Sequence, residues 1–440
     1  VEDWRQEYNI NLKVTYDDLY FQGWYEDKNR GPFVGPHYAL NDETNIGGNY
    51  VFAEVGYKKT FDEMFTLKPR VYYDQFDTDL HVEALPEGVT LPVDTDGDDV
   101  YDRFYTYRDG IVGNLAVSEK VVGTEIPFDY QLFQGNLLTL GFEYRLIHQT
   151  NIRYTANTNP STLEPLNSLE DFSDTLPWLK ETTRRIGSVY LQDTWDITGT
   201  LNLTLGIRHD QYSDFGGTTN PRAGITWAFM KNASLKFMYG EAFRPPTFVE
   251  MYTAHQITVL GNEDLDPERI RTYEGGFSYQ FNKQVASTVN YFHSRVKDLI
   301  VLDTLSTSEM TSQYENSGHG HIQGIEMETK IDISNGSYLF MNYTFQDAED
   351  DDGNDLPFSA KHKGNFGVNV HCWKYINTHL STFVSGRRSR EKDDERDDLP
   401  AFALLNLSVA GKEFFNTMEI QGTVFNLLDK DYSDPGPVAI

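Results

Sequence analysis

The connections between the extended segments of this chain alternate between short and long, which limits the folds open to it. Apolar and polar residues alternate along most of its 440 residues, as in Leu201, Leu203, Leu205 and Ile207. Short turns fall at residues 16–18, 61–63, 132–135, 197–200, 230–232, 281–284, 334–337, 373–375 and 413–416. Long connections separate them at residues 28–47, 81–114, 150–182, 242–269, 297–321, 348–360 and 388–399, with a shorter one at 211–219. Short turns at one end and long loops at the other are typical of a transmembrane β-barrel, and a soluble sandwich has no reason to keep them.

The predicted fold class is therefore all-β, a transmembrane antiparallel β-barrel. The period-two pattern gives about 18 candidate strands. In such a barrel one face of each strand meets lipid and the other lines the lumen. We expect Leu203, Leu205, Val368 and Cys372 to face lipid, and Asn202, Arg208, Glu326 and His371 to face the lumen.

Composition agrees with this fold. Only 39% of the residues are hydrophobic, yet 14% are aromatic, which suits an apolar outer band with aromatic girdles around a polar interior. No uninterrupted apolar run approaches the roughly 18 residues of a transmembrane helix. The formal net charge of −30 argues against a nucleic-acid partner, because phosphates require a basic surface. An acidic soluble protein is the alternative reading of that charge.

Several motifs lie in the second half of the chain. Residues 239–247 read YGEAFRPPT, followed by Glu250, Tyr252, GNEDLDPE at 261–268, and Thr272, Tyr273 and Glu274. Further on come Tyr314, Asn316, Gly324 and Glu326, then NYT at 342–344 and NLLDKDY at 426–432. In kind and order these motifs resemble the "FRAP" and "NPDL" boxes and later segments of TonB-dependent receptors. The resemblance is most specific from about Val189 to Tyr432, and Glu263 stands where the family usually has proline.

The resemblance implies a 22-stranded barrel in the Gram-negative outer membrane, working as an active-transport receptor. It implies import of a metal chelate, with a ferric siderophore favoured over haem or cobalamin, and energy supplied by the TonB–ExbB–ExbD complex. The surrounding lipid and lipopolysaccharide are the other expected partners. A passive porin, which needs no rim boxes, is the leading rival, and a binding or adhesion platform is another.

Two parts of the family pattern have no counterpart here. Nothing resembles the N-terminal plug domain or its TonB box, and residues after Tyr432 do not form a closing strand with a terminal aromatic. Val1 is not an initiator methionine, and no secretion signal follows it. Residues 1–440 are therefore interpreted as a barrel domain lacking its plug and last strand, so the natural protein is expected to be longer at both ends.

Five residues of the rim boxes are the candidate ligand contacts: Phe243, Arg244, Tyr252, His255 and Asp264. Prolines 245 and 246 lack N–H donors and are expected to end the strand near Gly240, so that the loop leaves the barrel rigidly. Glu268 is expected to cap the chain, or to pair with Arg269 or Arg271, where the loop re-enters the barrel. A role in shaping the loop, without any ligand contact, is an equal alternative for Phe243, Arg244 and Asp264.

The acidic run at 94–102 is the candidate metal site. Asp94, Asp96, Asp98 and Asp99 offer oxygen ligands for calcium in an extracellular loop, but the run departs from an EF-hand because Asp99 replaces the glycine and Tyr105 the final glutamate. A solvated loop is the alternative, and it is the default for the acidic runs at 347–355 and 391–398. No covalently bound cofactor is expected.

Histidines in the same loops allow a haem alternative. His255, with His319 or His321, would supply the axial ligands. No phosphate loop, nucleophile elbow or metal-spaced His/Cys cluster is found, and Glu326 and Glu328 lie on one face too regularly for an acid–base pair. The sequence therefore predicts a transport protein rather than an enzyme.

Overall fold

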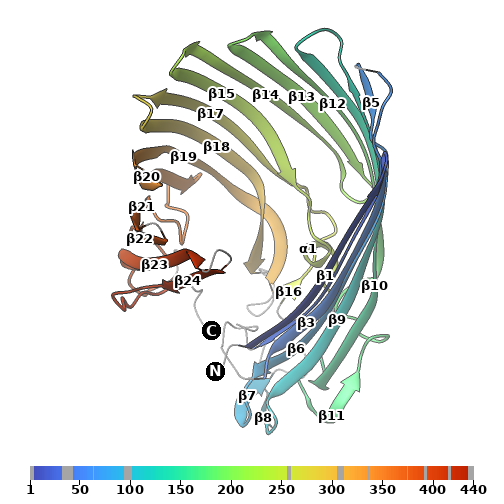
Figure 1. Ribbon diagram of the computed structural model, residues 1–440. Helices are drawn as coiled ribbons and strands as arrows, with labels where there is room; N and C mark the ends of the chain where they lie inside the picture. Colours follow the sequence, from blue (N-terminus) through green and yellow to red (C-terminus); the bar gives the residue numbers. More distant parts are fainter. Residues whose placement is uncertain are drawn as a thin grey trace.

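The computed structural model describes residues 4–31, 43–62, 64–93, 102–254, 259–304, 312–334, 336–373, 375–390, 394–414 and 418–434. Most of them belong to one sheet of 22 strands, which curves round a central space (Figure 1). Four of these strands are short additions: β4 (Lys59–Thr60), β5 (Phe65–Leu67), β11 (Pro165–Asp171) and β16 (Val259–Leu260). A separate two-stranded sheet pairs β7 (Val89–Val93) with β8 (Arg103–Tyr107).

The remaining eighteen strands follow one another round the sheet, each antiparallel to the next. They are β1 (Trp4–Tyr16), β2 (Leu19–Gly31), β3 (Asn45–Tyr57), β6 (Arg70–Leu85), β9 (Ile111–Tyr130), β10 (Asn136–Thr158), β12 (Thr182–Thr198), β13 (Leu201–Tyr212), β14 (Gly216–Met230), β15 (Ala233–Arg244), β17 (Glu268–Gln280), β18 (Val285–Thr304), β19 (Ser312–Ser334), β20 (Ser337–Asp350), β21 (His362–Trp373), β22 (Ile376–Ser385), β23 (Phe402–Phe414) and β24 (Met418–Val424). The predicted fold class and strand number are confirmed.

The polarity of the sheet is the reverse of that of a soluble protein. On β13, Leu205 and Ile207 point outward and are each 48% exposed, while Asp210 on the inner face is 2% exposed. The inner face also holds Arg208, whose Nη2 lies 2.7 Å from Glu143 Oε2 across the lumen wall. Exposed apolar side chains outside and buried charges inside are what a lipid-facing barrel requires.

Charged side chains are paired along the inner wall. Arg70 bridges two strands, with Nη1 2.8 Å from Glu54 Oε2 and Nη2 2.7 Å from Glu125 Oε2. Glu54 is only 2% exposed, so its charge is hidden from water and needs the guanidinium. The inner wall therefore carries a network of paired charged side chains.

Glycines make room for tyrosines on this wall, as Gly141 and Gly123 show. A Cβ at Gly141 would overlap the ring of Tyr190 on the paired strand, and one at Gly123 would overlap the ring of Tyr72. The ring lies flat across the glycine, so the hydroxyl of Tyr190 reaches Glu125 and donates a 2.7 Å hydrogen bond to Oε1. Close contact between ring and backbone fixes the inner-face register at both positions.

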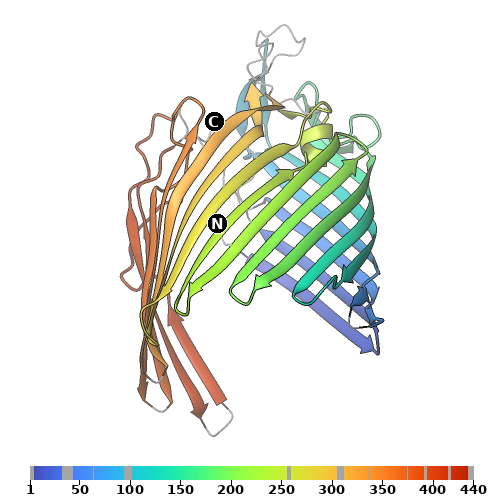
Figure 2. The same cartoon turned by 90° about the horizontal axis from the view of Figure 1, so that it is seen from above.

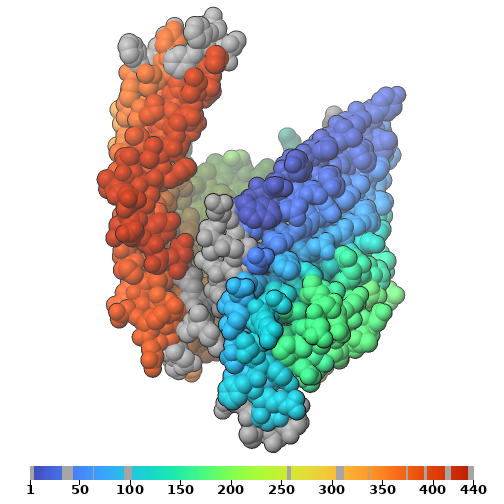
Figure 3. Space-filling model, turned by 90° about the horizontal axis from the view of Figure 1, so that it is seen from below, coloured from blue at the N-terminus to red at the C-terminus, as the bar shows by residue number. Residues whose placement is uncertain are grey.

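The two outermost strands keep a free edge. In the part of the chain that the structure describes, no pairing joins β1 to β24. Every residue of β1 and of β24 is exposed. Figure 3 shows the opening between the N-terminal strands and the C-terminal strands.

Several predicted loops are shorter than expected because strands extend into them. β18 and β19 stay paired as far as Thr304 and Ser312, so most of the predicted 297–321 connection is sheet. The connection at 211–219 is a tight turn between Tyr212 and Gly216, and the 81–114 connection contains β7 and β8. All nine short turns fall between strands as predicted. Within the described residues no helix is long and apolar enough to cross a membrane, which has no bearing on crossing by strands.

Candidate functional site: the barrel rim

The described residues between β15 and β17, 245–254 and 259–267, fold into a compact cap, here called the rim segment. It contains the helix α1 (Phe248–Tyr252), which stands at the long-loop end of the strands (Figure 2). Thr247 caps α1: its Oγ1 accepts a 3.1 Å hydrogen bond from the Glu250 amide, while Glu250 Oε2 accepts one of 2.7 Å from the Thr247 amide. This reciprocal capping box explains why a helix begins directly after two prolines.

Arg244 joins the two strands that flank the rim segment. Its Nε and Nη2 donate to the two oxygens of Glu268 at 2.6 and 2.7 Å, and its Nη1 lies 3.0 Å from both oxygens of Glu250. Glu268 also accepts a 2.9 Å hydrogen bond from the Ile300 amide on β18. The expected pairing of Glu268 with Arg269 or Arg271 is wrong, because alternate residues of β17 face opposite sides and Arg244 stands directly across from Glu268.

A second arginine, Arg184 of β12, holds the backbone at Pro246, the second of the two prolines. Its Nη2 donates a 2.9 Å hydrogen bond to the Pro246 carbonyl oxygen, and its Nε lies 2.5 Å from Asp214 Oδ2. The guanidinium also lies 4.6 Å from the ring centre of Phe248. Sequence reasoning missed Arg184, because nothing local to residue 184 signals a contact sixty residues further on.

Apolar packing completes the cap. Buried residues from the rim segment, from β10 and from the 172–181 connection form one cluster: Ile152, Leu179, Phe248, Met251, Tyr252 and Leu265. Burial also raises the pKa of the Tyr252 phenol. The rim segment is therefore fixed against the inner wall and does not project freely from the barrel.

The predicted ligand contacts have different surroundings. Tyr252 is buried at 9% exposure beneath Lys180, whose Nζ lies 5.3 Å from its ring centre, and Arg244 is fully engaged by two carboxylates. Asp264 is exposed, and its amide donates a 3.0 Å hydrogen bond to Asn262 Oδ1. His255 lies outside the described residues. The contacts observed for Arg244 are those of the loop-shaping alternative, and the ligand-contact role of the five residues stays a prediction.

Phe243 fills a split in the barrel wall. Pairing of β14 with β15 ends at Arg222 and Gly240, just before Pro221, which has no N–H to donate. Above this point β15 pairs only with β17, and Phe243 packs against Tyr212 with ring centres 5.8 Å apart. Although β15 continues to Arg244, past the predicted end near Gly240, its contact with β14 stops at the predicted place.

A hollow of about 710 Å³, here called the lumen hollow, opens on the inner side of this split. Arg145, Arg208 and Arg222 line it together with Tyr190 and Phe243, and the carboxylates of Glu125, Asp210 and Glu241 line it as well. The three arginines come from β10, β13 and β14. The Nε of Arg145 is buried, lies 3.4 Å from Glu143 Oε1 and donates no hydrogen bond within the described structure. Arg208 is paired with Glu143 and Asp210, whereas Arg222 donates to Gln192 and forms no ion pair within the described residues.

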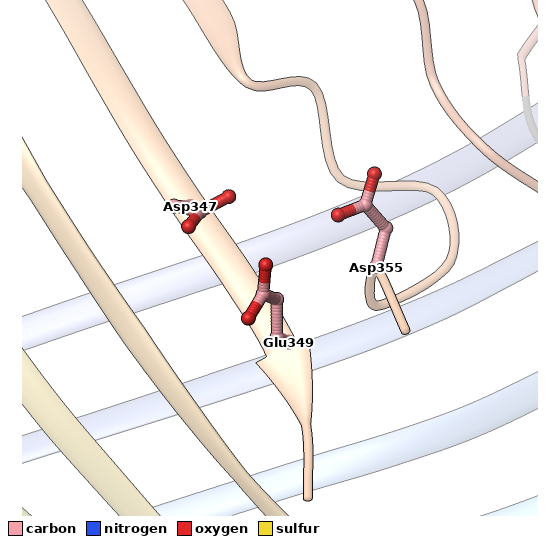
Figure 4. Close-up of side chains that lie close together, drawn as sticks. All are labelled: Asp347, Glu349 and Asp355. Carbon is pink, nitrogen blue, oxygen red and sulfur yellow. The ribbon is translucent and has the colours of Figure 1, made fainter. Parts of the chain in front are cut away.

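The acidic loops were the candidate metal sites. Asp94, Asp96, Asp98 and Asp99 lie outside the described residues, so the calcium expectation stays a prediction. Asp347, Glu349 and Asp355 bring carboxylate oxygens within 4.8 Å of one another (Figure 4). Lys361 already stands there, with Nζ 2.9 Å from Asp347 and 2.8 Å from Asp355. Hydrogen bonds from this ammonium to Asp355 and Asp347 raise the pKa of Lys361, so its single positive charge offsets part of the charge of the three carboxylates.

The last acidic run also contains an internal pair. Asp394 accepts hydrogen bonds from Arg396 Nε at 2.8 Å and from Arg396 Nη2 at 2.6 Å. The Arg396 hydrogen bond lowers the pKa of Asp394 to about 2. This run is therefore an internally paired turn as well as a solvated one.

Comparison with known proteins agrees with this architecture. A ferric enterobactin receptor, PirA of Pseudomonas aeruginosa, is 23% identical over 366 residues, which cover 73% of this chain and 49% of that protein. The chain thus spans about half the length of the curated relative it matches.

Solved structures share the fold at low sequence identity. The ferric-catecholate import receptor Fiu of E. coli K12 matches with a TM-score of 0.69 at 15% identity, covering 98% of this chain and 71% of that one. The copper transporter OprC matches with a TM-score of 0.73 at 15% identity, covering 98% and 66%. The family described as "TonB dependent receptor-like, beta-barrel" matches residues 2–427. An inverted barrel wall, a rim capped by the expected boxes and this match over nearly the whole chain together show that the protein belongs to the TonB-dependent receptor β-barrel family.

Proposed function

We propose that this chain forms the wall and rim of an outer-membrane receptor that imports a ferric siderophore, energised by the TonB–ExbB–ExbD complex through a plug. The Gram-negative outer membrane is the proposed location, since lipid must surround the exposed apolar face. No reaction is catalysed in this proposal: the barrel positions a chelate and provides its path.

The observation that carries the proposal is the lumen hollow. Its three arginines lie on the inner wall of a chain whose formal net charge is −30. A ferric complex of several catecholates carries negative charge on flat aromatic rings. Guanidinium groups attract that charge and stack on such rings, and Tyr190 and Phe243 add aromatic surface. Ferric catecholates also appear in the printed descriptions of PirA and Fiu.

Other cargo is possible within the same fold, since OprC is described as a copper transporter. Haem could take an imidazole as axial ligand, for which His255 is the candidate in the sequence. A porin would need no ion-paired cluster such as Arg244, Glu250 and Glu268, here called the clamp. A porin and a TonB-coupled receptor differ most clearly in their need for energy, because only the receptor loses uptake when the proton-motive force is removed.

The test is growth and iron-55 uptake in a strain lacking the gene, supplied with the full-length protein. A ferric tricatecholate, haem or inorganic copper is given as the limiting metal source. We expect tricatecholate uptake that a protonophore abolishes, and about tenfold weaker half-saturation in Arg222→Gln, since a hydrogen bond from a charged group contributes about 1.5–3 kcal/mol. Lys231→Gln, in the β14–β15 turn at the opposite end, is the matched control.

Three outcomes would overturn the proposal. Uptake that persists with the protonophore would indicate a porin. Growth on haem alone, lost in His255→Ala, would indicate a haem receptor. Equal effects of Arg222→Gln and Lys231→Gln would remove the lumen hollow from the ligand path.

A further inference from the structure

The inner face of β20–β24 is lined by asparagine side chains and hydroxyl groups, here called the amide face. The register of the sheet places them side by side, as Asn342 and Asn365 show. The members are Asn342 (β20), Asn365 and Asn369 (β21), Asn377 and Ser381 (β22), Asn406 and Ser408 (β23) and Thr423 (β24).

The alternation of side chains places the amide face inside the barrel. The residues of the other parity are apolar and point outward, since Phe366, Val370 and Val409 are 44%, 40% and 42% exposed. Asn369, by contrast, is 5% exposed. The amide face therefore lines the lumen, and Figure 1 shows β20–β24 across the central space from β3, β6, β9 and β10.

The two halves of the lumen wall differ in charge. Across the lumen from the amide face, Arg70 bridges Glu54 and Glu125. On the inner face of β20–β24, between Lys363 near the long-loop end and Glu419 near the short-turn end, no described residue is an aspartate, glutamate, lysine or arginine. Fixed ion pairs suit a stationary partner, because a shift of that partner would bring like charges together. A neutral surface imposes no such register.

The asparagines of the amide face bond to one another and keep capacity for a ligand. Asn365 Nδ2 donates to Asn342 Oδ1 at 2.8 Å, and Asn377 Nδ2 donates to Asn369 Oδ1 at 2.8 Å. Each carboxamide has two N–H donors. Within the described part of the chain, one N–H of Asn377 and both of Asn342 have no acceptor. An anionic oxygen in the lumen can accept from these groups.

A flat aromatic surface lies between two levels of the amide face. Phe340 lies across Gly367, midway between Asn365 and Asn369, where a Cβ would overlap its ring. The rings of Phe340 and His379 are parallel within 3°, with centres 5.8 Å apart. At about 3.3 Å per residue, the two asparagine levels on β21 are about 13 Å apart. The lumen therefore offers neutral donors, a flat ring and neutral donors again in succession.

We propose that the amide face is the surface along which the ferric catecholate passes through the lumen, as a row of weak binding sites. The inference rests on the proposed function, since it takes the cargo to be an anionic chelate with flat rings. A neutral donor strengthens binding roughly 2- to 10-fold, whereas a charged donor strengthens it roughly 10- to 150-fold. Passage requires each site to bind weakly enough to release the cargo to the next one. Neutral donors meet that requirement, whereas a row of cations would retain an anion.

Photo-crosslinking tests which half of the wall the moving chelate touches. Phe383→p-benzoylphenylalanine places a reactive group beside Asn365, seven residues from the start of β22 at the short-turn end. Phe76→p-benzoylphenylalanine is the matched control on the inner face across the lumen, in register with Tyr50 and six residues from the start of β6.

Cells carrying the full-length protein take up a carbon-14 ferric tricatecholate under illumination, with or without a protonophore. In energised cells we expect about tenfold more cross-linked radioactivity at position 383 than at position 76, the ratio for one or two neutral hydrogen bonds. With the protonophore, neither position should be labelled.

A second pair of variants measures the rate of passage. Ser381→Lys and Thr204→Lys each add a cation at an inner-facing residue whose side chain makes no hydrogen bond in the described structure. Ser381→Lys should lower maximal iron-55 uptake about tenfold at unchanged half-saturation, because a charged donor holds the anion longer. Thr204→Lys should take up iron as wild type does. The electrophoretic mobility of unheated protein checks that each barrel is folded.

The outcomes separate this inference from the proposed function. Equal cross-linking at positions 383 and 76, or equal maximal uptake in the two lysine variants, would overturn the amide face as the path. Uptake of the tricatecholate that persists with the protonophore, or no uptake by wild type, would instead overturn the proposed function.

Discussion

Removing the Arg244 side chain should loosen the rim segment without unfolding the barrel. Arg244→Ala leaves Glu250 and Glu268, which are 14% and 15% exposed, facing each other without their shared cation. The two carboxylates then repel one another, and Glu250 is less able to cap α1 at Thr247. The loss of stability should be confined to α1 and the residues hydrogen-bonded to it, because β15 and β17 keep their own antiparallel hydrogen bonds.

The size of the effect follows from the exposure of the three groups. Fully exposed ion pairs contribute about 0–1 kcal/mol. Removing one partner of a buried pair costs about 3–5 kcal/mol. Arg244 is 41% exposed while both carboxylates are mostly covered, so the local opening free energy should fall by about 2 kcal/mol. That corresponds to roughly thirtyfold faster local opening.

Hydrogen exchange measured by mass spectrometry resolves this local change in the full-length protein. The reporters are the amides of Met251, Thr253 and Asn262, which donate to backbone carbonyl oxygens at 3.1, 3.2 and 2.9 Å. Their exchange should accelerate about thirtyfold, while amides in the middle of β15 stay unchanged. Arg244→Lys should give an intermediate result, because lysine keeps the charge but lacks the planar fork.

Arg271→Ala is the matched control. It removes the ion pair with Glu241 on the outer face of the same hairpin, where Arg271 is 54% exposed, and should leave the rim amides unchanged. If the amides of Met251 and Thr253 in Arg244→Ala exchanged at the wild-type rate, the proposed stabilising role of the clamp would be refuted. If ligand uptake fell in that variant while exchange did not change, Arg244 would be a ligand contact instead.

The other predictions concern the wall and one loop. Leu205→Arg, on the lipid face, should cost about 2–4 kcal/mol of unfolding free energy, and Thr204→Arg, on the lumen face, much less, as urea unfolding in vesicles can measure. Gly141→Ala should cost about 1–3 kcal/mol by overpacking, and Tyr190→Ala in the same chain should recover part of it. Because the pKa of Asp394 is lowered to about 2, its turn contact is fully formed above the ordinary aspartate pKa of about 3.9 and is lost as pH falls through 2. At pH 3 the rate of carbodiimide labelling of Asp394 should therefore still be the rate of an ionised carboxylate.

Most of the fold could be predicted because barrel rules act locally. Period-two alternation set the faces of Leu205 and Arg208, and each tight turn marked a strand boundary. Loop lengths were less predictable. Hydrophilic segments such as those in β18 and β19 continue as paired strands above the membrane, where water replaces lipid and no apolar face is needed. Alternation cannot mark a strand end in that region.

The rim was only partly predictable because its contacts join distant segments. Thr247 and Glu250 are three residues apart and carry the capping-box signal for α1, which period-two reasoning passed over. The contacts of Arg184 with Pro246 and of Arg244 with Glu268 depend on which strands meet at the rim. Such contacts require the register of the sheet, which a single sequence does not supply.

We expect the paired charges at the rim and the cargo contacts to be separate sets of residues, and their ion pairs show why. Arg244, Glu250 and Glu268 satisfy one another, so a ligand that displaced any of them would leave a covered charge unpaired. Their arrangement therefore suits any cargo that must pass beneath α1. Selectivity should instead come from charges that the protein leaves available, such as Arg222 in the lumen hollow and Asp264 on the exposed rim. Substitutions at these two positions should change which chelate is carried, while those in the clamp should change how firmly the rim is held.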